Sequence, residues 1–136
     1  MSKSADRVWN GLVALVMDTR QDWRRRVVEA TGLPFGRVRA LKRLYDGPLA
    51  LHELADAMTV DAPAATVAVN DLVKRGLVAR KPHPTNGRLK LVSLTPKGRE
   101  VVARMKAVTE EAPAAFASLS PAELAAIERV LSQMTR

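Results

Sequence analysis

The sequence predicts a mostly α-helical fold with one small β-hairpin, an α+β arrangement. Apolar residues recur on one side of a helix in four stretches of the chain, whereas residues 77–94 mix Leu and Val with interleaved Arg and Lys. An Asn-Gly pair lies in the middle of this basic stretch, and that dipeptide is a strong signal for a hairpin turn. Because a two-stranded hairpin is not stable alone in water, we expect it to pack on the helices that precede it.

The N-terminal third of the chain predicts two helices. The first covers residues 5–30 and ends at Thr31-Gly32, because glycine can adopt the left-handed conformation and Pro34 blocks continuation. The second covers residues 34–45, and the Asp-Gly-Pro sequence after it forms a turn.

Two shorter helices follow, separated by a tight break. They are predicted over residues 50–57 and 62–75. Asp61 is a suitable N-cap for the second, and Pro63 lies in its first turn, where a missing N–H costs little. These are the proportions of a helix-turn-helix.

The hairpin and two more helices complete the chain. Strands are predicted over residues 77–82 and 88–94, joined by a turn in which Asn86-Gly87 takes positive φ. Thr95 caps the next helix, which is expected to continue past Pro113 with a kink. The last helix starts with a capping box of Ser120 and Glu123. A helix-turn-helix followed by a packed hairpin is a winged helix.

The charge of the chain is arranged in blocks. Its formal net charge is +8, with eight Lys/Arg against two Asp/Glu in residues 20–43 and ten against one in residues 74–106. Residues 44–73 contain five acidic residues and no Lys or Arg. Separate basic blocks favour a polyanion as partner. The alternative is a basic surface that serves solubility alone.

Several classes of function are disfavoured by the residues present. Cysteine is absent, which excludes disulfides and thiolate metal sites. His52 and His83 fall on different predicted elements without further ligands, so we expect no metal, and no nucleophile–base pair or Gly-rich loop indicates catalysis or a cofactor. No apolar run approaches the ~20 residues of a membrane span, and no signal peptide is recognisable, so a cytoplasmic location without membrane contact is expected.

The segments HELADAM, LVKRGLVARKPHPTNGRLKLVSLTPKG and LSPAEL resemble the MarR family of bacterial transcriptional regulators, in an order that covers nearly the whole chain. The resemblance implies a single unit over residues 1–136, with a winged helix-turn-helix over 34–96 and dimerisation helices over 5–31 and 97–136. It implies a homodimer that binds double-stranded DNA at a pseudo-palindromic operator, usually as a repressor, and is released by a small aromatic or anionic effector. Two alternatives are a sequence-tolerant architectural DNA-binding protein without an effector and, in a different class, a small-molecule enzyme or carrier.

The resemblance assigns the recognition helix to residues 62–75 and the wing to residues 82–90. Arg88 matches a wing arginine that enters the minor groove, and we favour this role because the hairpin is stiff and basic; a solvated loop charge is the alternative. Hydrogen-bonded readout is expected mainly from Thr66 and Asn70, with methyl contacts from small apolar residues and phosphate contacts from cations at the helix–wing junction. The candidate DNA-binding residues are Ala62, Ala64, Thr66, Val67, Asn70, Lys74, Arg75, Arg80, Lys81, Arg88 and Lys90.

The chain departs from the family pattern at several positions. His83, Asn86 and Gly87 occupy wing positions that usually carry two aspartates and a second arginine, which puts the usual brace of the wing arginine in doubt. Val67 replaces a frequent basic residue of the recognition helix. Thr59 replaces a frequent glycine in the helix-turn-helix break, and because β-branched residues disfavour positive φ, we expect this turn to be built differently.

An effector pocket is predicted between the first helix and the helix that starts at Pro96. Its candidate lining residues are Trp9, Met17, Trp23 and Arg24. For the aromatic and Met side chains, packing in the core or at a dimer interface is favoured over pocket lining. For the arginine run at 24–26 a solvated face is favoured, with phosphate contact or an anion-binding wall of the pocket as alternatives.

Overall fold

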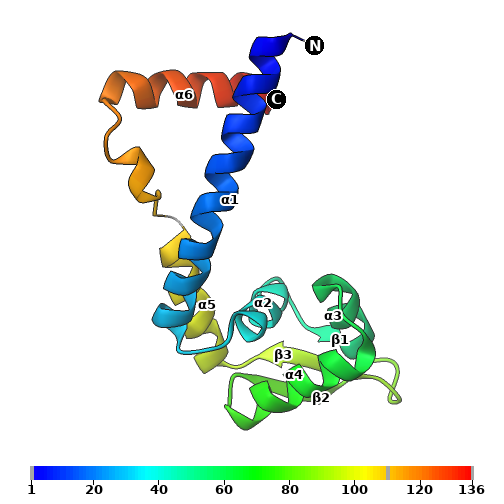
Figure 1. The fold of residues 1–136 in the computed structure, drawn as a ribbon. Helices are drawn as coiled ribbons and strands as arrows, with labels where there is room; N and C mark the ends of the chain where they lie inside the picture. Colours follow the sequence, from blue (N-terminus) through cyan, green and yellow to red (C-terminus); the bar gives the residue numbers. More distant parts are fainter. Residues whose placement is uncertain (1, 110, 136) are drawn as a thin grey trace.

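The computed structural model describes residues 2–109 and 111–135, and it confirms a mostly helical fold with a small antiparallel sheet (Figure 1). A basal lobe contains the sheet and the short helices, and the long first helix extends away from it. The elements in chain order are α1 (Lys3–Thr31), α2 (Phe35–Arg43), β1 (Leu49–Ala50), α3 (Leu51–Met58), α4 (Ala62–Lys74), β2 (Val78–Pro82), β3 (Lys90–Leu94), α5 (Pro96–Thr109), a 3₁₀ turn (Ala114–Phe116) and α6 (Pro121–Met134).

The sheet has three strands in the order β1-β3-β2. The predicted hairpin is present, with Val78 opposite Leu94 and Pro82 opposite Lys90. The third strand, β1, was not predicted; it pairs Leu49 with Val92 along the other edge of β3. Two residues are too short to show the period-2 pattern by which a strand is recognised.

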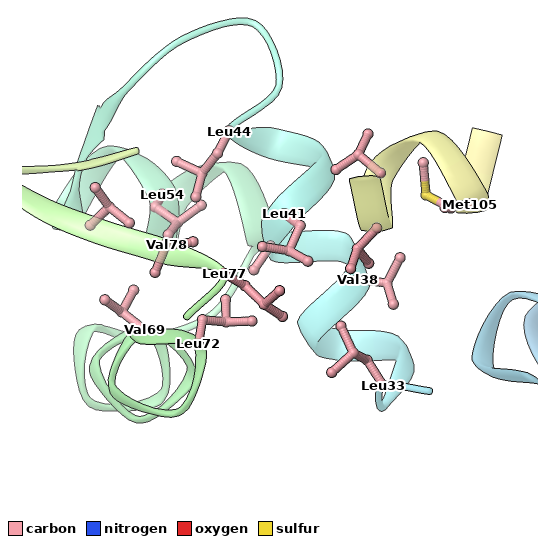
Figure 2. Packing of buried hydrophobic residues seen from close by; sticks show 14 of the residues in the cluster. Leu33, Val38, Leu41, Leu44, Leu54, Val69, Leu72, Leu77, Val78 and Met105 are labelled. Carbon is pink, nitrogen blue, oxygen red and sulfur yellow. The ribbon is translucent and has the colours of Figure 1, made fainter. Parts of the chain in front are cut away.

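The hydrophobic core lies between the sheet and helices α2, α3 and α4 (Figure 2). Helix α5 closes it at one side through Val101, Val102 and Met105, and α1 contributes Val27 from its last turns. The side chains that carry the core are branched aliphatics, which fill space in well-defined rotamers. The largest fully buried ones are Leu41, Leu44, Leu54, Leu72, Val27, Val38, Val69, Val92 and Val102.

Helix α1 is anchored in the core only at its C-terminal end. It begins at the N-cap Ser2 and ends at Gly32, which has φ 71° and donates its N–H to the Val28 carbonyl at 2.8 Å, as the sequence predicted. Its N-terminal half leaves large apolar side chains exposed, including Trp9, which is 65% exposed.

The break between α3 and α4 uses a left-handed residue although that residue is Thr59, with φ 57° and ψ 45°. The Val60 N–H donates to the Ala55 carbonyl at 3.0 Å and the Thr59 N–H to the Asp56 carbonyl at 3.1 Å. These are the two bonds of a Schellman motif, which satisfies carbonyls at a helix end. The expectation that this turn would be built differently was therefore wrong.

The segment between α5 and α6 also corrects a prediction. Helix α5 ends at Thr109 and does not continue past Pro113, which instead forms the N-cap of the 3₁₀ turn. A residue that precedes proline is disfavoured in the helical region, so a continuous helix with a kink does not form here. Helix α6 begins as predicted, with the Glu123 N–H donating to Ser120 Oγ and the Ser120 N–H donating to Glu123 Oε1.

Every described residue of α6 is exposed, and α6 lies at the level of the N-terminal half of α1, away from the sheet (Figure 1). Within the ranges that the structure covers, none of the helices combines the length and the apolar character needed to cross a membrane.

Candidate nucleic-acid interface

Helix α4 presents a small, largely uncharged face to solvent. Asp61 caps it, with Oδ1 accepting from the Ala64 N–H at 2.8 Å. Its buried stripe of Ala65, Ala68, Val69 and Leu72 packs into the lobe, so the residues between these positions must face outward. Of the five residues that were expected to face DNA, Ala62, Ala64, Val67 and Asn70 are exposed and Thr66 is half-buried.

Two of the predicted base-reading groups are engaged within the protein. The Thr66 hydroxyl donates to the Ala62 carbonyl at 3.0 Å, which leaves its oxygen as an acceptor and its methyl group free. Asn70 Oδ1 accepts from Arg80 Nη2 on the neighbouring strand β2. A bidentate contact to adenine needs both amide atoms of Asn70, so this arrangement changes the expected role of Asn70.

Asp71 joins two arginines beside the recognition helix. Its Oδ2 accepts from Arg37 Nε at 2.9 Å and from Arg75 Nε at 3.0 Å. The hydrogen bond from Arg37, assisted by Arg75, holds the pKa of the Asp71 carboxyl below its usual value. Arg75 was among the residues expected to bind DNA, whereas Arg37 was not, because its approach from α2 depends on tertiary packing and has no local signal in the sequence.

The wing loop over residues 83–89 is organised by side chains of the loop itself. His83 Nδ1 accepts from the N–H groups of Thr85 at 3.2 Å and Asn86 at 3.1 Å. Asn86 accepts twice, from the Leu89 N–H at its carbonyl and from the Arg88 N–H at Oδ1. Neither Asn86 nor Gly87 has positive φ, so the predicted conformation of the turn at this pair was wrong. A longer loop, closed by these side-chain acceptors, replaces it.

Arg88 lies exposed in this loop, and none of the ion pairs found in the described part of the chain involves it. His83 and Asn86 stand where the family pattern has aspartates, and they hold the loop by hydrogen bonds to backbone N–H groups. The wing is therefore braced through its backbone and leaves the Arg88 guanidinium available. Lys74, Arg75, Arg80, Lys81 and Lys90 are also exposed around the helix–wing junction.

The C-terminal end of α4 is fixed to the start of α5. The Thr95 N–H donates to the Leu77 carbonyl at 3.1 Å, and its hydroxyl donates to the Gly76 carbonyl at 2.7 Å. Lys97 Nζ reaches the Arg75 carbonyl at 3.3 Å. Gly98 packs so closely here that a Cβ would lie 2.1 Å from the Leu77 oxygen. The Leu-Thr-Pro-Lys-Gly sequence thus couples the recognition helix to α5.

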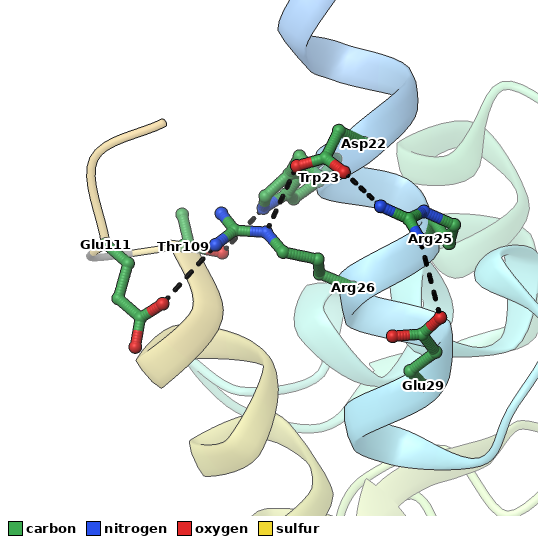
Figure 3. A network of polar contacts seen from close by, with 7 residues as sticks. All are labelled: Asp22, Trp23, Arg25, Arg26, Glu29, Thr109 and Glu111. Carbon is green, nitrogen blue, oxygen red and sulfur yellow. Dashed lines mark hydrogen bonds and ion pairs between the residues drawn. The ribbon is translucent and has the colours of Figure 1, made fainter. Parts of the chain in front are cut away.

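Trp23, one of the candidate effector residues, belongs to a network of polar contacts between α1 and the end of α5 (Figure 3). Trp23 Nε1 donates to Thr109 Oγ1 at 3.2 Å, and Arg26 Nη1 lies 3.3 Å from Glu111 Oε2. Arg24 stacks over the Phe35 ring, 4.7 Å from its centroid. Arg25 and Arg26 both pair with Asp22, so this arginine run is tied into local ion pairs.

The four candidate effector residues are separated along α1. Trp9 and Met17 lie together at a shallow apolar depression on its exposed face. Trp23 lies 14 positions after Trp9, about 21 Å further along the helix at 1.5 Å per residue. It borders a cavity of about 250 Å³ beside Asp22 and Glu111. It also borders a second one, of about 240 Å³, whose lining residues are Arg20, Trp23, Phe35, Val38, Arg39, Lys42, Arg43 and Met105.

Within residues 2–109 and 111–135, no group of three or more His, Cys, Asp or Glu side chains could hold a metal ion. His52 lies exposed on α3, and His83 is used by the wing loop.

Comparison with known proteins places this arrangement among transcription regulators. The model of the MarR family matches residues 31–89. A candidate transcriptional regulatory protein for the hcr operon of Thauera aromatica is 31% identical over 114 residues, which are 82% of this chain and 69% of that protein.

Solved structures share the fold over nearly the whole chain. The structure of RV1404 from Mycobacterium tuberculosis has a TM-score of 0.78 and 27% identity, covering 99% of this chain and 94% of the other. A mutant of MepR from S. aureus bound to an oligodeoxyribonucleotide has a TM-score of 0.74 and 18% identity, covering 93% and 95%. At that identity the second likeness concerns the fold alone.

Proposed function

Since the chain belongs to the MarR family of DNA-binding transcriptional regulators, which are not enzymes, we propose that it acts as a homodimeric repressor. It occupies a pseudo-palindromic operator, occludes the promoter and is released by a small anionic effector. The observation that carries the DNA-binding part is α4, whose exposed small and apolar face is flanked by the cations of the helix–wing junction and of the wing. In this proposal α4 contacts the base edges, and the surrounding Lys and Arg side chains contact phosphates and give the salt-dependent part of the affinity.

Dimerisation is supported by apolar surface that has no partner within the described part of the chain. No residue of α6 is buried, and Leu124, Ile127 and Leu131 expose 42%, 39% and 48% of their surface. On α1, Val8, Trp9, Leu12 and Val16 are exposed as well. Burial of each large side chain contributes roughly 1.5–3 kcal/mol, so two such faces can hold a dimer together.

The dimer is tested by sedimentation of the wild type, Ile127→Glu and Glu128→Gln. Both positions are exposed on α6, but Ile127 belongs to the apolar stripe and Glu128 does not. We expect Ile127→Glu to sediment as a monomer and to lose operator binding, while Glu128→Gln remains a dimer. An Ile127→Glu protein that stays a DNA-binding dimer would contradict this interface.

Effector release is supported by the cavity of about 240 Å³ between α1, α2 and α5. Four cations and two aromatic rings line it, and no carboxylate of residues 2–109 or 111–135 does. This lining suits a single-ring aromatic carboxylate, because the cavity is smaller than the ~300–1,000 Å³ of drug-sized ligand sites. Arg39 also donates to the Met58 carbonyl at 3.4 Å, at the end of α3. An anion that draws Arg39 into the cavity therefore removes this hydrogen bond from the end of α3, next to the break of the helix-turn-helix.

The switch is tested by operator titrations with and without benzoate and its hydroxylated derivatives. Coupling of this kind typically changes DNA affinity about 5–150-fold. We expect the change to disappear in Arg39→Gln and to persist in Arg25→Gln, which removes a cation outside the cavity lining. Ligands that bind in the cavity and leave operator affinity unchanged would rule out the switch.

A second function, sequence-tolerant architectural DNA binding, is favoured by one observation. The described exposed face of α4 contains no Arg, Lys or Gln before Lys74, and these side chains supply many of the strong base contacts. Selection of bound sequences from a random DNA pool, at stated salt, separates the two functions. A regulator enriches one motif, whereas an architectural protein coats the pool evenly.

A further inference from the structure

An arginine from strand β2 lies against the exposed face of the recognition helix. Strand residues alternate between faces, so Val78 and Arg80 point the same way. Val78 is buried in the core against which α4 packs, whereas Arg80, two residues further, lies beyond the core and is exposed. Its guanidinium meets Asn70 of α4 through the Nη2–Oδ1 hydrogen bond.

We infer that Arg80 reads a G·C base pair in the major groove and that Asn70 positions it there, an inference that rests on the proposed operator binding. Thr66 and Val67 lie four and three residues before Asn70 on α4, so the three share one side of the helix, with Val67 and Asn70 exposed and Thr66 half-buried. Asn70 therefore holds the Arg80 guanidinium beside the residues that face the base edges. The exposed face of α4, which the structure describes in full, has no Arg or Lys before Lys74, and Arg80 of strand β2 supplies a cation there.

The hydrogen-bonding capacity of the pair fits this role. A guanidinium carries five N–H donors in a planar fork, and one of them is given to Asn70 Oδ1. The remaining donors suffice for the O6 and N7 acceptors of guanine, the commonest specific contact of arginine with DNA. Asn70 keeps both N–H donors of its amide, and one of the two lone pairs of its Oδ1 is taken by Arg80. The pair therefore presents more donors than acceptors, which complements the O6 and N7 acceptors of guanine better than the N6 amino donor of adenine.

A phosphate contact is the competing role for Arg80. Phosphate binding tolerates lysine, because the charge is what matters, whereas a bidentate base contact needs the guanidinium fork. The position of Arg80 also favours a base contact over a phosphate contact, because its guanidinium is hydrogen-bonded to Asn70 on the exposed face of α4. Lys81, the next residue of the strand, points to the opposite face of the sheet. Lys81 is therefore the matched control for a cation that serves phosphate.

The test is a competition titration over a library of operator variants at one salt concentration. The proteins compared are the wild type, Arg80→Ala, Arg80→Lys, Asn70→Ala and Lys81→Ala. We expect the wild type to prefer G·C at one position per half-site by roughly 5- to 150-fold. Arg80→Ala and Arg80→Lys should both lose that preference, and Lys81→Ala should weaken all variants by one common factor. Asn70→Ala should reduce the same preference, and the Asn70→Ala/Arg80→Ala double variant should be no worse at this base pair than Arg80→Ala.

Three outcomes overturn the inference in different ways. If Arg80→Lys keeps the G·C preference, or if Arg80→Ala weakens every operator variant equally, Arg80 contacts phosphate. If Asn70→Ala leaves the preference intact while Arg80→Ala abolishes it, Arg80 reads the base and the positioning role of Asn70 is wrong. If the wild type prefers no sequence at all, the proposed site-specific regulation fails together with this inference. If the wild type is sequence-specific but Arg80→Ala does not change its base preference, only the role of Arg80 is wrong and the proposed regulator function stands.

Discussion

Among single residues, Thr59 holds the conformation that is least favourable for its type. It is the only residue other than glycine with positive φ in the described ranges, and it stands at the break between the two helices of the DNA-binding motif. A left-handed conformation costs a residue with a Cβ roughly 1–2 kcal/mol, and a β-branched side chain is the least tolerant. The Schellman hydrogen bonds and the half-buried Val60 hold the turn against this cost.

We expect Thr59→Gly to stabilise the protein by about 0.5–1 kcal/mol. The relief of strain exceeds the additional backbone entropy that glycine loses on folding. The free energy of unfolding in urea, compared at equal protein concentration, measures this change. Thr59→Ala keeps a Cβ and should gain less; a Thr59→Gly protein less stable than wild type would show that the hydroxyl or methyl group makes a contact that outweighs the strain.

Arg88 is the residue expected to sense DNA shape. Narrow A·T-rich minor grooves have an enhanced negative potential that attracts arginine, and the Arg88 guanidinium takes part in none of the ion pairs of the described chain. Arg88→Ala should weaken specific binding by about 1–3 kcal/mol and flatten the preference for A·T flanks. Titration over operators with altered flanks measures both effects. Lys90→Ala is the control and should weaken all operators alike; an unchanged flank preference in Arg88→Ala would contradict the role.

Among elements, the contact between α5 and the end of α4 tolerates the least change. An added Cβ at Gly98 would overlap the Leu77 carbonyl oxygen, which belongs to the backbone and cannot rotate away. We expect Gly98→Ala to lower the free energy of unfolding by about 1–3 kcal/mol or more, as overpacking does. Gly36→Ala in α2 is the matched control: a Cβ there meets nothing within 4 Å, and alanine's helix propensity should stabilise by up to about 1 kcal/mol. Equal effects of the two substitutions would rule out the steric explanation.

The ion pair between α2 and α4 predicts a dependence of stability on pH. In the folded state the pKa of Asp71 lies below its ordinary value of 3.8, because Arg37 and Arg75 stabilise the charged carboxylate. The ion pair therefore stabilises the fold fully at pH values above this ordinary pKa. This contribution is lost as the pH falls through the lowered value. The stability difference between wild type and Asp71→Asn should therefore be constant above about pH 5 and shrink below pH 3.8. A difference that persists undiminished at pH 2 would assign the effect to packing instead.

Elements whose ends obey local rules were predictable from the sequence, and elements set by distant contacts were not. The ends of α1, α4 and α6 follow from Gly32, Asp61 and Ser120, whose capping needs only neighbours in the chain. The loop of the wing and strand β1 do not follow, since the first depends on His83 as an acceptor and the second on an edge supplied by β3.

Local rules were not sufficient for the candidate site. The outward face of α4 was assigned through the family resemblance, because apolar residues surround this helix and its period alone does not separate the exposed Val67 from the buried Val69. The contacts of Asn70 with Arg80 and of Asp71 with Arg37 could not be predicted, because each joins residues ten or more positions apart on different elements.

For the whole molecule, folding and assembly should be linked. The apolar surfaces of α1 and α6 have no partner within the described chain, so much of their stabilisation must come from a second copy. A protein stabilised by association has a melting temperature that rises with its concentration. We expect this rise for the wild type between micromolar and hundreds of micromolar concentrations, and no rise for Ile127→Glu. Identical melting curves for the wild type across that range would indicate a monomer that is stable alone.

Helix α1 runs without interruption for 29 residues, from the exposed apolar face to the core of the winged helix. At 1.5 Å per residue it is about 43 Å long, so a tilt of about 5° at one end displaces the other by roughly 4 Å. This displacement exceeds the rise of one DNA base pair, about 3.4 Å. If two copies are joined at the exposed end, a change of a few degrees in the angle between them moves the two recognition helices by a full base-pair step. The angle between the two α1 helices of the dimer would then determine which spacing of half-sites on the DNA the protein can bind.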